Sequence, residues 1–476
     1  MICEGFAYPK VMQFFEEISA IPRASHHEEK ISDYLECFAK ERGLEYLRDE
    51  VGNLLIRRPA SAGYENRAPM LLQGHVDMVC EKNEGVVHDF DKDPLKLYVK
   101  DGWLRAKGTT LGADNGVAVA IMMAMLDGMA EEHPALECLF TVSEEVGLDG
   151  ARAFDYSNIS ARRMLNMDSA DERSIIVGCA GGVRSSIRMT VMRASANVGE
   201  TVVLRIGGLC GGHSGEDIDK GRVNAAKVMG RVLMELLQEE PELRLISLQS
   251  GTKDNAIPRE AEAVILVPCV ATVLTRVKKL EEIIRKELCA EDRNFTLTAC
   301  ETKCHDRAMD KDSTRRALNL LHAVVSGVLK NYNVKAVLYS RNLGVVTTDE
   351  DVIEFVYSSR SPDDSLLDHS IAELDGFASI LMANAKHYNR YPGWEYSEES
   401  KLREDYIAAY RRLFGDEPRI QLIHAGLECG LIKQAIPDMD MLSCGPNIVN
   451  LHSPEEAMEI ASFERFVQLV IEVLKA

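Results

Sequence analysis

The order of apolar segments along this 476-residue chain constrains its fold more than any other feature of the sequence. Short apolar runs at residues 70–73, 136–142 and 164–167 have the length of buried strands. Between the first two lies an alanine- and methionine-rich stretch, residues 117–129, which has the length of a helix. Strands that alternate with helices form layered α/β structures. We therefore expect an α/β fold with a central mixed sheet flanked by helices.

The pattern changes after the glycine pair at residues 181 and 182. Residues 184–193 alternate polar and apolar side chains, as in an antiparallel strand with one solvated face. From residue 201 the pattern predicts strand, helix, two strands, helix and strand, which is the ferredoxin-like order. The succession then recurs, with helices predicted near 315–329 and 366–385. These features indicate an α+β unit that is doubled.

The α/β pattern returns after residue 398, where a helix near 402–414 precedes a strand at 420–424. The first domain is therefore predicted to be split by an insertion, as the length of the chain allows. We assign the two parts of the α/β domain to residues 1–181 and 396–476, and the inserted α+β domain to residues 182–395.

Composition narrows the classes of function. The chain has 75 acidic and 55 basic residues, a formal charge of -20, which disfavours nucleic acids and anionic membranes as partners. No apolar run reaches the roughly 18 residues of a membrane span, and the first segment lacks a signal-peptide pattern. The twelve cysteines form no CxxC pair, which is typical of reduced thiols in a cytosolic protein. We expect a cytoplasmic location.

Three short segments rich in acidic residues or histidine follow predicted strands, at residues 74–78 (GHVDM), 112–116 (GADNG) and 143–147 (SEEVG). Sites in α/β folds form where strands end. His75 and Asp77 are two residues apart, so on an extended backbone the carboxylate can orient the imidazole of a metal ligand. Such a pair is also common in solvated turns. The pair alone therefore leaves both interpretations open.

The second and third segments also have two interpretations. Asp114 lies between Gly112 and Gly116, where a turn can present one carboxylate to two metal ions, but Asp-Asn-Gly is also a common turn sequence. Glu144 and Glu145 repel each other unless they are exposed or near cations. If cations are bound, one glutamate can be a ligand while the other serves as a general base.

Two further residues complete a candidate metal site. Asp168 follows a predicted strand, and His452 lies just before a helix that we expect to be capped by Ser453. Each alone is typical of a turn or a loop. Together, the two histidines and three carboxylates form a nitrogen and oxygen set that suits paired zinc ions about 3.5 to 4 Å apart. Cobalt or manganese would suit the same ligands.

The order of these residues resembles that of the co-catalytic zinc peptidases and deacylases over nearly the whole chain. Four segments are similar to those of the aminoacyl-histidine dipeptidase family: LLQGHVDMVCEKN, GTTLGADNGVAVA, TVSEEVGLDGA and LCGGHSGEDI. The resemblance implies two zinc ions that share the ligand Asp114. The implied ligands are His75, Asp114 and Asp168 for one ion, and Asp114, Glu145 and His452 for the other.

The resemblance also implies three catalytic roles. Asp77 would orient His75, and Glu144 would deprotonate the attacking water and pass the proton to the leaving amine. The inserted domain would be a lid, in which His213 of GGHSGED stabilises the oxyanion. Without the family, His213 is typical of a mobile glycine-rich turn.

Three more residues resemble positions that bind the free carboxylate of a substrate: Asn255, Arg360 and Gly426. The planar guanidinium of arginine suits a carboxylate. Outside this family, Arg360 would be typical of a surface salt bridge and Asn255 of a turn. Many superfamily members dimerise through a single ferredoxin-like unit. The longer insertion here leaves open whether the chain forms a homodimer and whether His213 acts in its own subunit.

The resemblance implies hydrolysis of short unblocked peptides that end in histidine. The rival within the superfamily is an N-acyl amino acid deacylase, which acts on a blocked amino group. A non-catalytic metal- or peptide-binding protein belongs to a different class, and such proteins usually lack the base or a ligand, whereas all of these positions are filled here. A nucleotide-binding protein is disfavoured because no GxGxxG or P-loop pattern links a strand to a helix.

Overall fold

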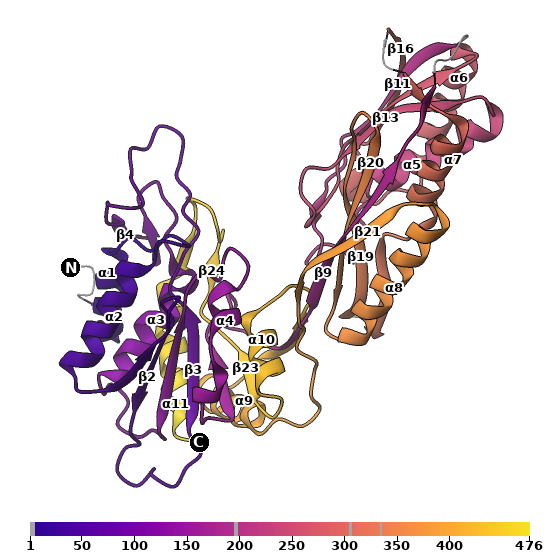
Figure 1. Ribbon diagram of the computed structural model, residues 1–476. Coiled ribbons are helices and arrows are strands. Elements are labelled where there is room, and N and C mark those ends of the chain that lie inside the picture. Colours follow the sequence, from indigo (N-terminus) through magenta and orange to yellow (C-terminus); the bar gives the residue numbers. More distant parts are fainter. Residues whose placement is uncertain (1–4, 195–198, 304–306, 334–335) are drawn as a thin grey trace. The chain divides into compact units, whose positions relative to one another are not determined.

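The computed structural model describes residues 5–194, 199–303, 307–333 and 336–476. By their internal contacts, these residues form two compact units, each with its own hydrophobic core (Figure 1). We call them the α/β unit, which comprises Met1–Gly178, Trp394–Leu422 and Leu427–Ala476, and the inserted unit, which comprises Cys179–Gly393 and Ile423–Gly426. Within the described residues, no helix is long and apolar enough to cross a membrane.

A mixed eight-stranded sheet forms the middle layer of the α/β unit. In spatial order its strands are β1 (Glu45–Arg48), β2 (Leu54–Arg58), β6 (Leu136–Thr141), β3 (Met70–His75), β7 (Arg163–Asn166), β23 (Asp440–Ser443), β8 (Ser174–Cys179) and β22 (Arg419–Ile423). The central strands β6, β3, β7 and β23 are parallel neighbours. All residues of β3 and β6 are buried, which explains why both strands are mainly apolar. The predicted strands and the α/β fold class are confirmed.

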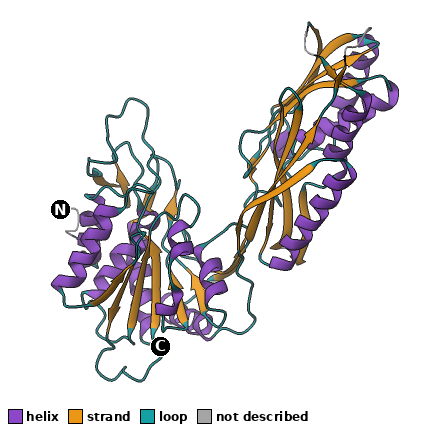
Figure 2. Ribbon diagram, viewed as in Figure 1, coloured by secondary structure: helices purple, strands orange, loops and turns teal. Residues whose placement is uncertain are grey.

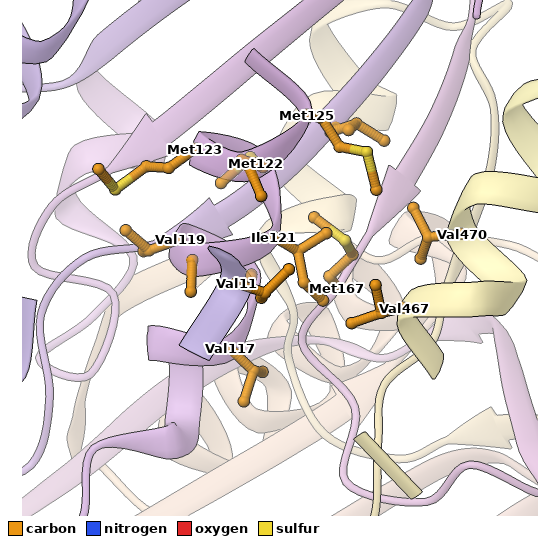
Figure 3. Packing of buried hydrophobic residues seen from close by; sticks show 14 of the residues in the cluster. Val11, Val117, Val119, Ile121, Met122, Met123, Met125, Met167, Val467 and Val470 are labelled. Atoms are coloured by element: carbon orange, nitrogen blue, oxygen red, sulfur yellow. The ribbon is translucent and has the colours of Figure 1, made fainter. Parts of the chain in front are cut away.

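Seven helices of the described residues belong to this unit: α1 (Pro9–Ser19), α2 (Glu29–Glu41), α3 (Ala113–Leu126), α4 (Asp149–Ala153), α9 (Lys401–Phe414), α10 (Glu428–Ala435) and α11 (Ile460–Leu474). Helix α3 contacts both α1 and β3. It is apolar on all sides because it is buried on all sides. Figure 3 shows Ile121 of α3 near Met167 and near Val467 of α11, all in one hydrophobic cluster. Ala113 and Val117 belong to the same cluster, so this core packs against the start of α3, where Asp114 is located.

A small antiparallel sheet ties the end of the chain to the segment that precedes α3. Its strands are β24 (Ile448–Val449), β25 (Ala457–Glu459), β5 (Trp103–Ala106) and β4 (Leu97–Lys100), in that order. Strand β25 pairs with β5 through Ala457 and Arg105. The loop between β24 and β25 carries His452, so this pairing holds that loop beside the segment that leads to Asp114.

The inserted unit contains one antiparallel sheet with the path β16-β11-β15-β13-β19-β20-β9-β21, and β18 pairs with β19. Its strands are β9 (Gly181–Thr190), β11 (Glu200–Gly207), β13 (Arg244–Ser250), β15 (Ala261–Val267), β16 (Thr296–Thr302), β18 (Gly327–Asn333), β19 (Ala336–Thr348), β20 (Val352–Ser361) and β21 (Asn384–Tyr391). Its helices are α5 (Ala225–Glu239), α6 (Val270–Arg285), α7 (Lys311–Ala323) and α8 (Asp364–Ile380). Figure 2 shows this unit as a sheet packed against helices.

The order of elements explains the doubling. The run β11-α5-β13-β15-α6-β16 is one ferredoxin-like βαββαβ set, with the spatial order β16-β11-β15-β13. The second set is β9-α7-β19-β20-α8-β21, and its strands follow the mirrored order β19-β20-β9-β21. The first set is inserted between β9 and α7 of the second, and β13 pairs with β19 where the two sets join.

Two predicted helices extend too far. Helix α7 ends at Ala323 and strand β18 begins at Gly327, so residues 327–329 are not helical. Helix α8 ends at Ile380, and Met382 has a left-handed φ of 51°, which an α-helix cannot contain. Strand β21 then starts at Asn384 and completes the second set, so the prediction of helix to residue 385 was wrong.

The predicted cap at Ser453 is also wrong, and a second pair with the spacing of a capping box, Ser25 and Glu28, does not cap a helix either. Helix α2 has no side-chain cap at its start, because Ser25 instead donates to Asp77 Oδ2 at 2.8 Å and Glu28 accepts from Ser143. Ser453 does not cap a helix, because β25 follows it and α11 begins only at Ile460. In both places the polar side chain holds a loop of the candidate site.

Candidate metal centre and active site

The structure brings the five predicted metal ligands together at the carboxyl ends of the central strands. They come from five separate segments: His75 ends β3, Asp114 lies at the start of α3, Glu145 and Asp168 follow β6 and β7, and His452 lies between β24 and β25. Carboxyl ends of parallel strands meet at one edge of a sheet, which explains why distant segments converge.

The first group of ligand atoms surrounds His75. Its Nε2 lies 3.1 Å from Asp114 Oδ1 and 3.6 Å from Asp168 Oδ1, and the three ligand atoms lie within 4.8 Å of one another. His75 Nδ1 lies 3.1 Å from the carbonyl oxygen of Asp77, which can only accept a hydrogen bond. The Nδ1–H is therefore the donor, and Nε2 is the nitrogen directed to the ligand group.

The second group surrounds His452. Its Nε2 lies 3.2 Å from Asp114 Oδ2 and 3.0 Å from Glu145 Oε1. Asp114 thus directs one oxygen to each group, which is the arrangement of a carboxylate that bridges two cations. Glu144 Oε2 lies 4.0 Å from His75 Nε2, and the ligand atoms of His75, Glu144 and Glu145 lie within 4.8 Å of one another. His452 contacts Glu145 of this adjacent pair.

Asp77 connects the histidine to the glutamate pair. Its carboxylate is fully buried and lies 3.3 Å from His75 Nδ1. It also accepts hydrogen bonds from the backbone N–H groups of Glu144 and Glu145, at 3.0 and 3.2 Å. Burial acts to raise the pKa of Asp77, but the bonds from His75 and Glu144 outweigh burial and lower this pKa. Asp77 therefore remains ionised and fixes both segments.

The electrostatic field of these groups suits cations. Burial raises the pKa of Asp168, and the Asp114 carboxylate adds to this effect, which brings the pKa to about 6. Burial alone would lower the pKa of His75, but the carboxylates of Asp168 and Asp114 hold it well above its ordinary value. Burial also raises the pKa of Glu144 well above its usual range, as does the nearby Asp168 carboxylate. The side chains thus create a strongly negative site of nitrogen and oxygen donors, which fits divalent metal ions.

A second polar cluster lies within the inserted unit and contains the other predicted residues. Arg360 Nη2 lies 3.4 Å from His213 Nε2, and Arg360 Nη1 donates to Tyr391 Oη at 2.9 Å. The carbonyl oxygen of Asn255 accepts from the backbone N–H of Ser214, the residue after His213, at 2.8 Å. A Cβ added to Gly426 would lie 2.8 Å from Tyr391, so this position has room only for glycine.

This cluster has the properties of an anion-binding site. The Nε of Arg360 and the Nδ1 of His424 are buried without a hydrogen-bond partner. Burial lowers the pKa of His424 to about 3, and the Arg360 charge acts in the same direction. Burial and Arg360 likewise lower the pKa of His213. The guanidinium is therefore the only charged group among these three, and it has an unused donor for a carboxylate.

Comparison with known proteins identifies the family. The sequence profile of peptidase family M20/M25/M40 matches residues 71–476. The chain belongs to this family. It is therefore an enzyme, and peptidases of this family depend on bound metal, in agreement with the ligand groups described above.

Two relatives resemble this M20/M25/M40 peptidase over almost its whole length. The cytosol non-specific dipeptidase of Escherichia coli (strain K12) is 41% identical over 466 residues, which cover 97% of this chain and 96% of the relative. The crystal structure of aminoacylhistidine dipeptidase from Vibrio alginolyticus has a TM-score of 0.92 at 35% identity and covers 99% of this chain and 97% of that one. These matches confirm the family resemblance found in the sequence.

A more distant structure shows the same fold. The aminopeptidase PepT from Bacillus cereus has a TM-score of 0.58 at 16% identity and covers 99% of this chain and 98% of its own.

The sequence did not reveal four polar residues that support the two clusters of this M20/M25/M40 peptidase. Tyr391 and His424 lie in the cluster of the inserted unit, and Arg23 and Glu456 lie behind the metal ligands. His424 stands two residues before Gly426, and Glu456 stands four residues after His452. Proximity to a predicted residue was thus the only available signal for these two.

Proposed function

We propose that the chain is a two-zinc dipeptidase of the cytoplasm that hydrolyses unblocked dipeptides, with histidine preferred as the second residue. The observation that carries this proposal is the position of Asp114, whose two oxygens face two separate groups of metal-ligand atoms. Two relatives that align with nearly the whole chain are named as dipeptidases, and one of these is an aminoacylhistidine dipeptidase.

In this proposal, one zinc ion is held by His75, Asp114 and Asp168, and the second by Asp114, Glu145 and His452. Bound zinc ions would polarise the carbonyl of the scissile bond and make a bound water more acidic. Cobalt or manganese could replace zinc in this donor set.

Glu144 is proposed as the general base. Its backbone N–H donates to Asp77 at 3.0 Å, which fixes the main chain, while its side chain is 15% exposed, so the carboxylate can reach a substrate. It would take a proton from the attacking water and deliver it to the nitrogen of the leaving amine. Glu145 does not share this role in the proposal because it is a ligand of the second ion together with His452, whose Nε2 lies 3.0 Å from Glu145 Oε1.

The cluster of the inserted unit is proposed to bind the substrate's negative charges. Arg360 would bind the terminal carboxylate with its planar guanidinium, assisted by Asn255 and Gly426. The neutral imidazole of His213, whose pKa is lowered by burial and Arg360, would donate a hydrogen bond to the oxyanion. The support for this assignment is the buried donor of Arg360 that has no partner.

The experiment that tests the function is release of free histidine from an unblocked Xaa-His dipeptide. We expect release in the presence of zinc, loss after a chelator is added, and recovery when zinc is restored. The Glu144→Gln variant should bind metal but release histidine at a rate lowered by about 10² to 10⁴. Turnover of the N-acetylated dipeptide with no turnover of the free one would overturn the proposal in favour of a deacylase.

A matched pair of substrates tests the role of Arg360. A dipeptide with a free carboxylate should be strongly preferred by the native enzyme over the same dipeptide with a terminal amide. Arg360→Lys should raise KM for the free acid and narrow this preference, because lysine lacks the two parallel donors. An unchanged preference would remove Arg360 from carboxylate binding.

A further inference from the structure

A buried glutamate holds the turn that presents the bridging carboxylate. Glu456 is only 2% exposed. Its two carboxylate oxygens accept from four consecutive backbone N–H groups at the start of α3: Leu111 (2.8 Å) and Gly112 (2.9 Å) at Oε2, and Ala113 (2.9 Å) and Asp114 (3.2 Å) at Oε1. Since both oxygens are used, the carboxylate fixes the position of the whole turn.

A buried arginine holds the same turn by donating hydrogen bonds to backbone carbonyl oxygens. Arg23 is 2% exposed, and its Nη2 donates to the carbonyl oxygen of Gly112 at 2.6 Å. Its Nη1 donates to the carbonyl oxygens of Val76 and Asp77, at 2.9 and 3.3 Å. A Cβ at Gly112 would lie 2.4 Å from Arg23 Nη2, so the close approach requires glycine. Arg23 thus joins the end of β3 to the turn before Asp114.

These contacts connect three segments that each carry a ligand. The end of β3 carries His75, the turn at 111–114 carries Asp114, and the loop that contains Glu456 also carries His452. Neither buried charge is among the ligand groups, so neither competes for a metal. A buried charge is costly unless hydrogen bonds compensate for the loss of water, so the burial of both side chains depends on the backbone groups of the turn.

We infer that Arg23 and Glu456 are positioning residues that set the distances from Asp114 to the two histidines, and thereby the affinity for both metal ions. This inference rests on the proposed metal site. A glutamine at position 456 would place an amide NH2 against two backbone N–H groups in either orientation, so two of the four accepted bonds would be lost. The turn would then be free to shift relative to both His75 and His452.

Glu137 offers a matched control in the same unit. It is 3% exposed and accepts from the backbone N–H groups of Ser160 and Ala161, at 3.1 and 2.9 Å. It lies near the start of β6, whereas the ligands lie at the carboxyl ends of the strands. Glu137→Gln therefore removes buried hydrogen bonds without a contact to the turn that carries Asp114 or to the loop that carries His452.

The test measures equilibrium binding of Co²⁺ and Zn²⁺ by competition with a chelating dye, together with the visible spectrum of the cobalt-loaded protein. Glu456→Gln and Arg23→Lys should weaken binding at both positions by about 10- to 100-fold and change the cobalt spectrum. In the double variant, the loss in free energy of metal binding should be smaller than the sum of the losses in the two single variants, because both residues act on one turn. Glu137→Gln should bind both metal ions with native affinity, although we expect its melting temperature to fall.

Native affinity and an unchanged spectrum in Glu456→Gln would overturn the inference, as would an equal loss in Glu137→Gln. Arg23→Lys, which retains the charge, provides the same test if Glu456→Gln does not fold. Binding of two metal ions without dipeptide hydrolysis would refute the proposed activity and leave this inference standing. A native protein that binds no metal would refute both.

Discussion

The replacement Asp77→Asn is a stringent test of the metal centre because it changes one atom of a fully buried group. Asp77 Oδ1 accepts from the backbone N–H of Glu144, and Oδ2 accepts from Ser25 Oγ and from the N–H of Glu145. Asparagine retains one acceptor oxygen. With its NH2 at the Oδ2 position, the Ser25 hydroxyl can rotate to accept, but the N–H of Glu145 loses its acceptor. With the NH2 at Oδ1, it would face His75 Nδ1 and the N–H of Glu144.

The orientation with the amide NH2 at the Oδ2 position costs less free energy, so we use it to estimate the loss of stability. One buried N–H without a partner costs roughly 1 to 3 kcal/mol in the free energy of unfolding. The loss of the negative charge beside His75 Nδ1, 3.3 Å away, also makes the imidazole a weaker donor to a metal. We therefore expect metal binding weakened by about 10- to 100-fold, with a proportionate fall in kcat/KM at limiting zinc that excess zinc partly restores.

Asp49→Asn is the matched control for this variant. Asp49 Oδ1 accepts from the backbone N–H groups of Val51, Gly52 and Asn53 in a turn of the same unit, and it is not among the ligand groups. Both variants should lower the melting temperature, but only Asp77→Asn should lower zinc affinity in a dye-competition titration. If Asp77→Asn binds zinc as tightly as the native protein does, the reasoning that Asp77 orients His75 is wrong.

Three further predictions follow from the site and the core. Glu144→Gln should lower kcat by about 10² to 10⁴, with two metal ions still bound by elemental analysis, and loss of metal would instead make Glu144 a ligand. Met122→Ala should lower the free energy of unfolding by about 2 to 5 kcal/mol in urea, because Met122 is fully buried in α3, and a change below 1 kcal/mol would mean that this core repacks. His424 has its pKa lowered to about 3 by burial and Arg360. Its contribution to stability is therefore present above the unfolded value near 6.5 and is lost as pH falls, by up to about 1.4 kcal/mol per pH unit. His424→Asn should flatten the decline in melting temperature between about pH 6 and pH 4, and an unchanged slope would contradict this account.

The arrangement of metal ligands could be anticipated because it depends on strand ends. His75, Asp168 and Glu145 each come at or after the end of a short apolar run with the length of a buried strand, and parallel strands place their ends at one edge of the sheet. Asp114 was a candidate for a different reason, because Gly112 and Gly116 lie on either side of it and favour a turn. His452 was a candidate from its residue type, but its assignment to one of the two ions came from the family resemblance, because no periodicity links a loop near the end of the chain to a strand at residue 75.

There is a physical reason why the sequence does not predict the roles of Arg23 and Glu456. In a sequence, both residues look like ordinary solvated charges, because their hydrogen-bond partners are backbone groups that are distant along the chain. Ser25 and Glu28 have the spacing of a capping box. That local signal was outweighed because each side chain finds a tertiary partner, Asp77 for one and Ser143 for the other.

Backbone strain shows how the surrounding fold imposes the geometry of the site. Several non-glycine residues with left-handed φ lie in the loops that carry its side chains: Ser143 (49°), Leu148 (62°), Asn450 (55°) and His452 (59°). Such a conformation costs about 1 to 2 kcal/mol for a residue with a Cβ. Ser143 stays in this conformation because its N–H and hydroxyl both bind Glu28, at 2.8 and 2.7 Å. The position of Glu144 therefore depends on tertiary hydrogen bonds and on the packed core behind α3, and local sequence preferences act against it.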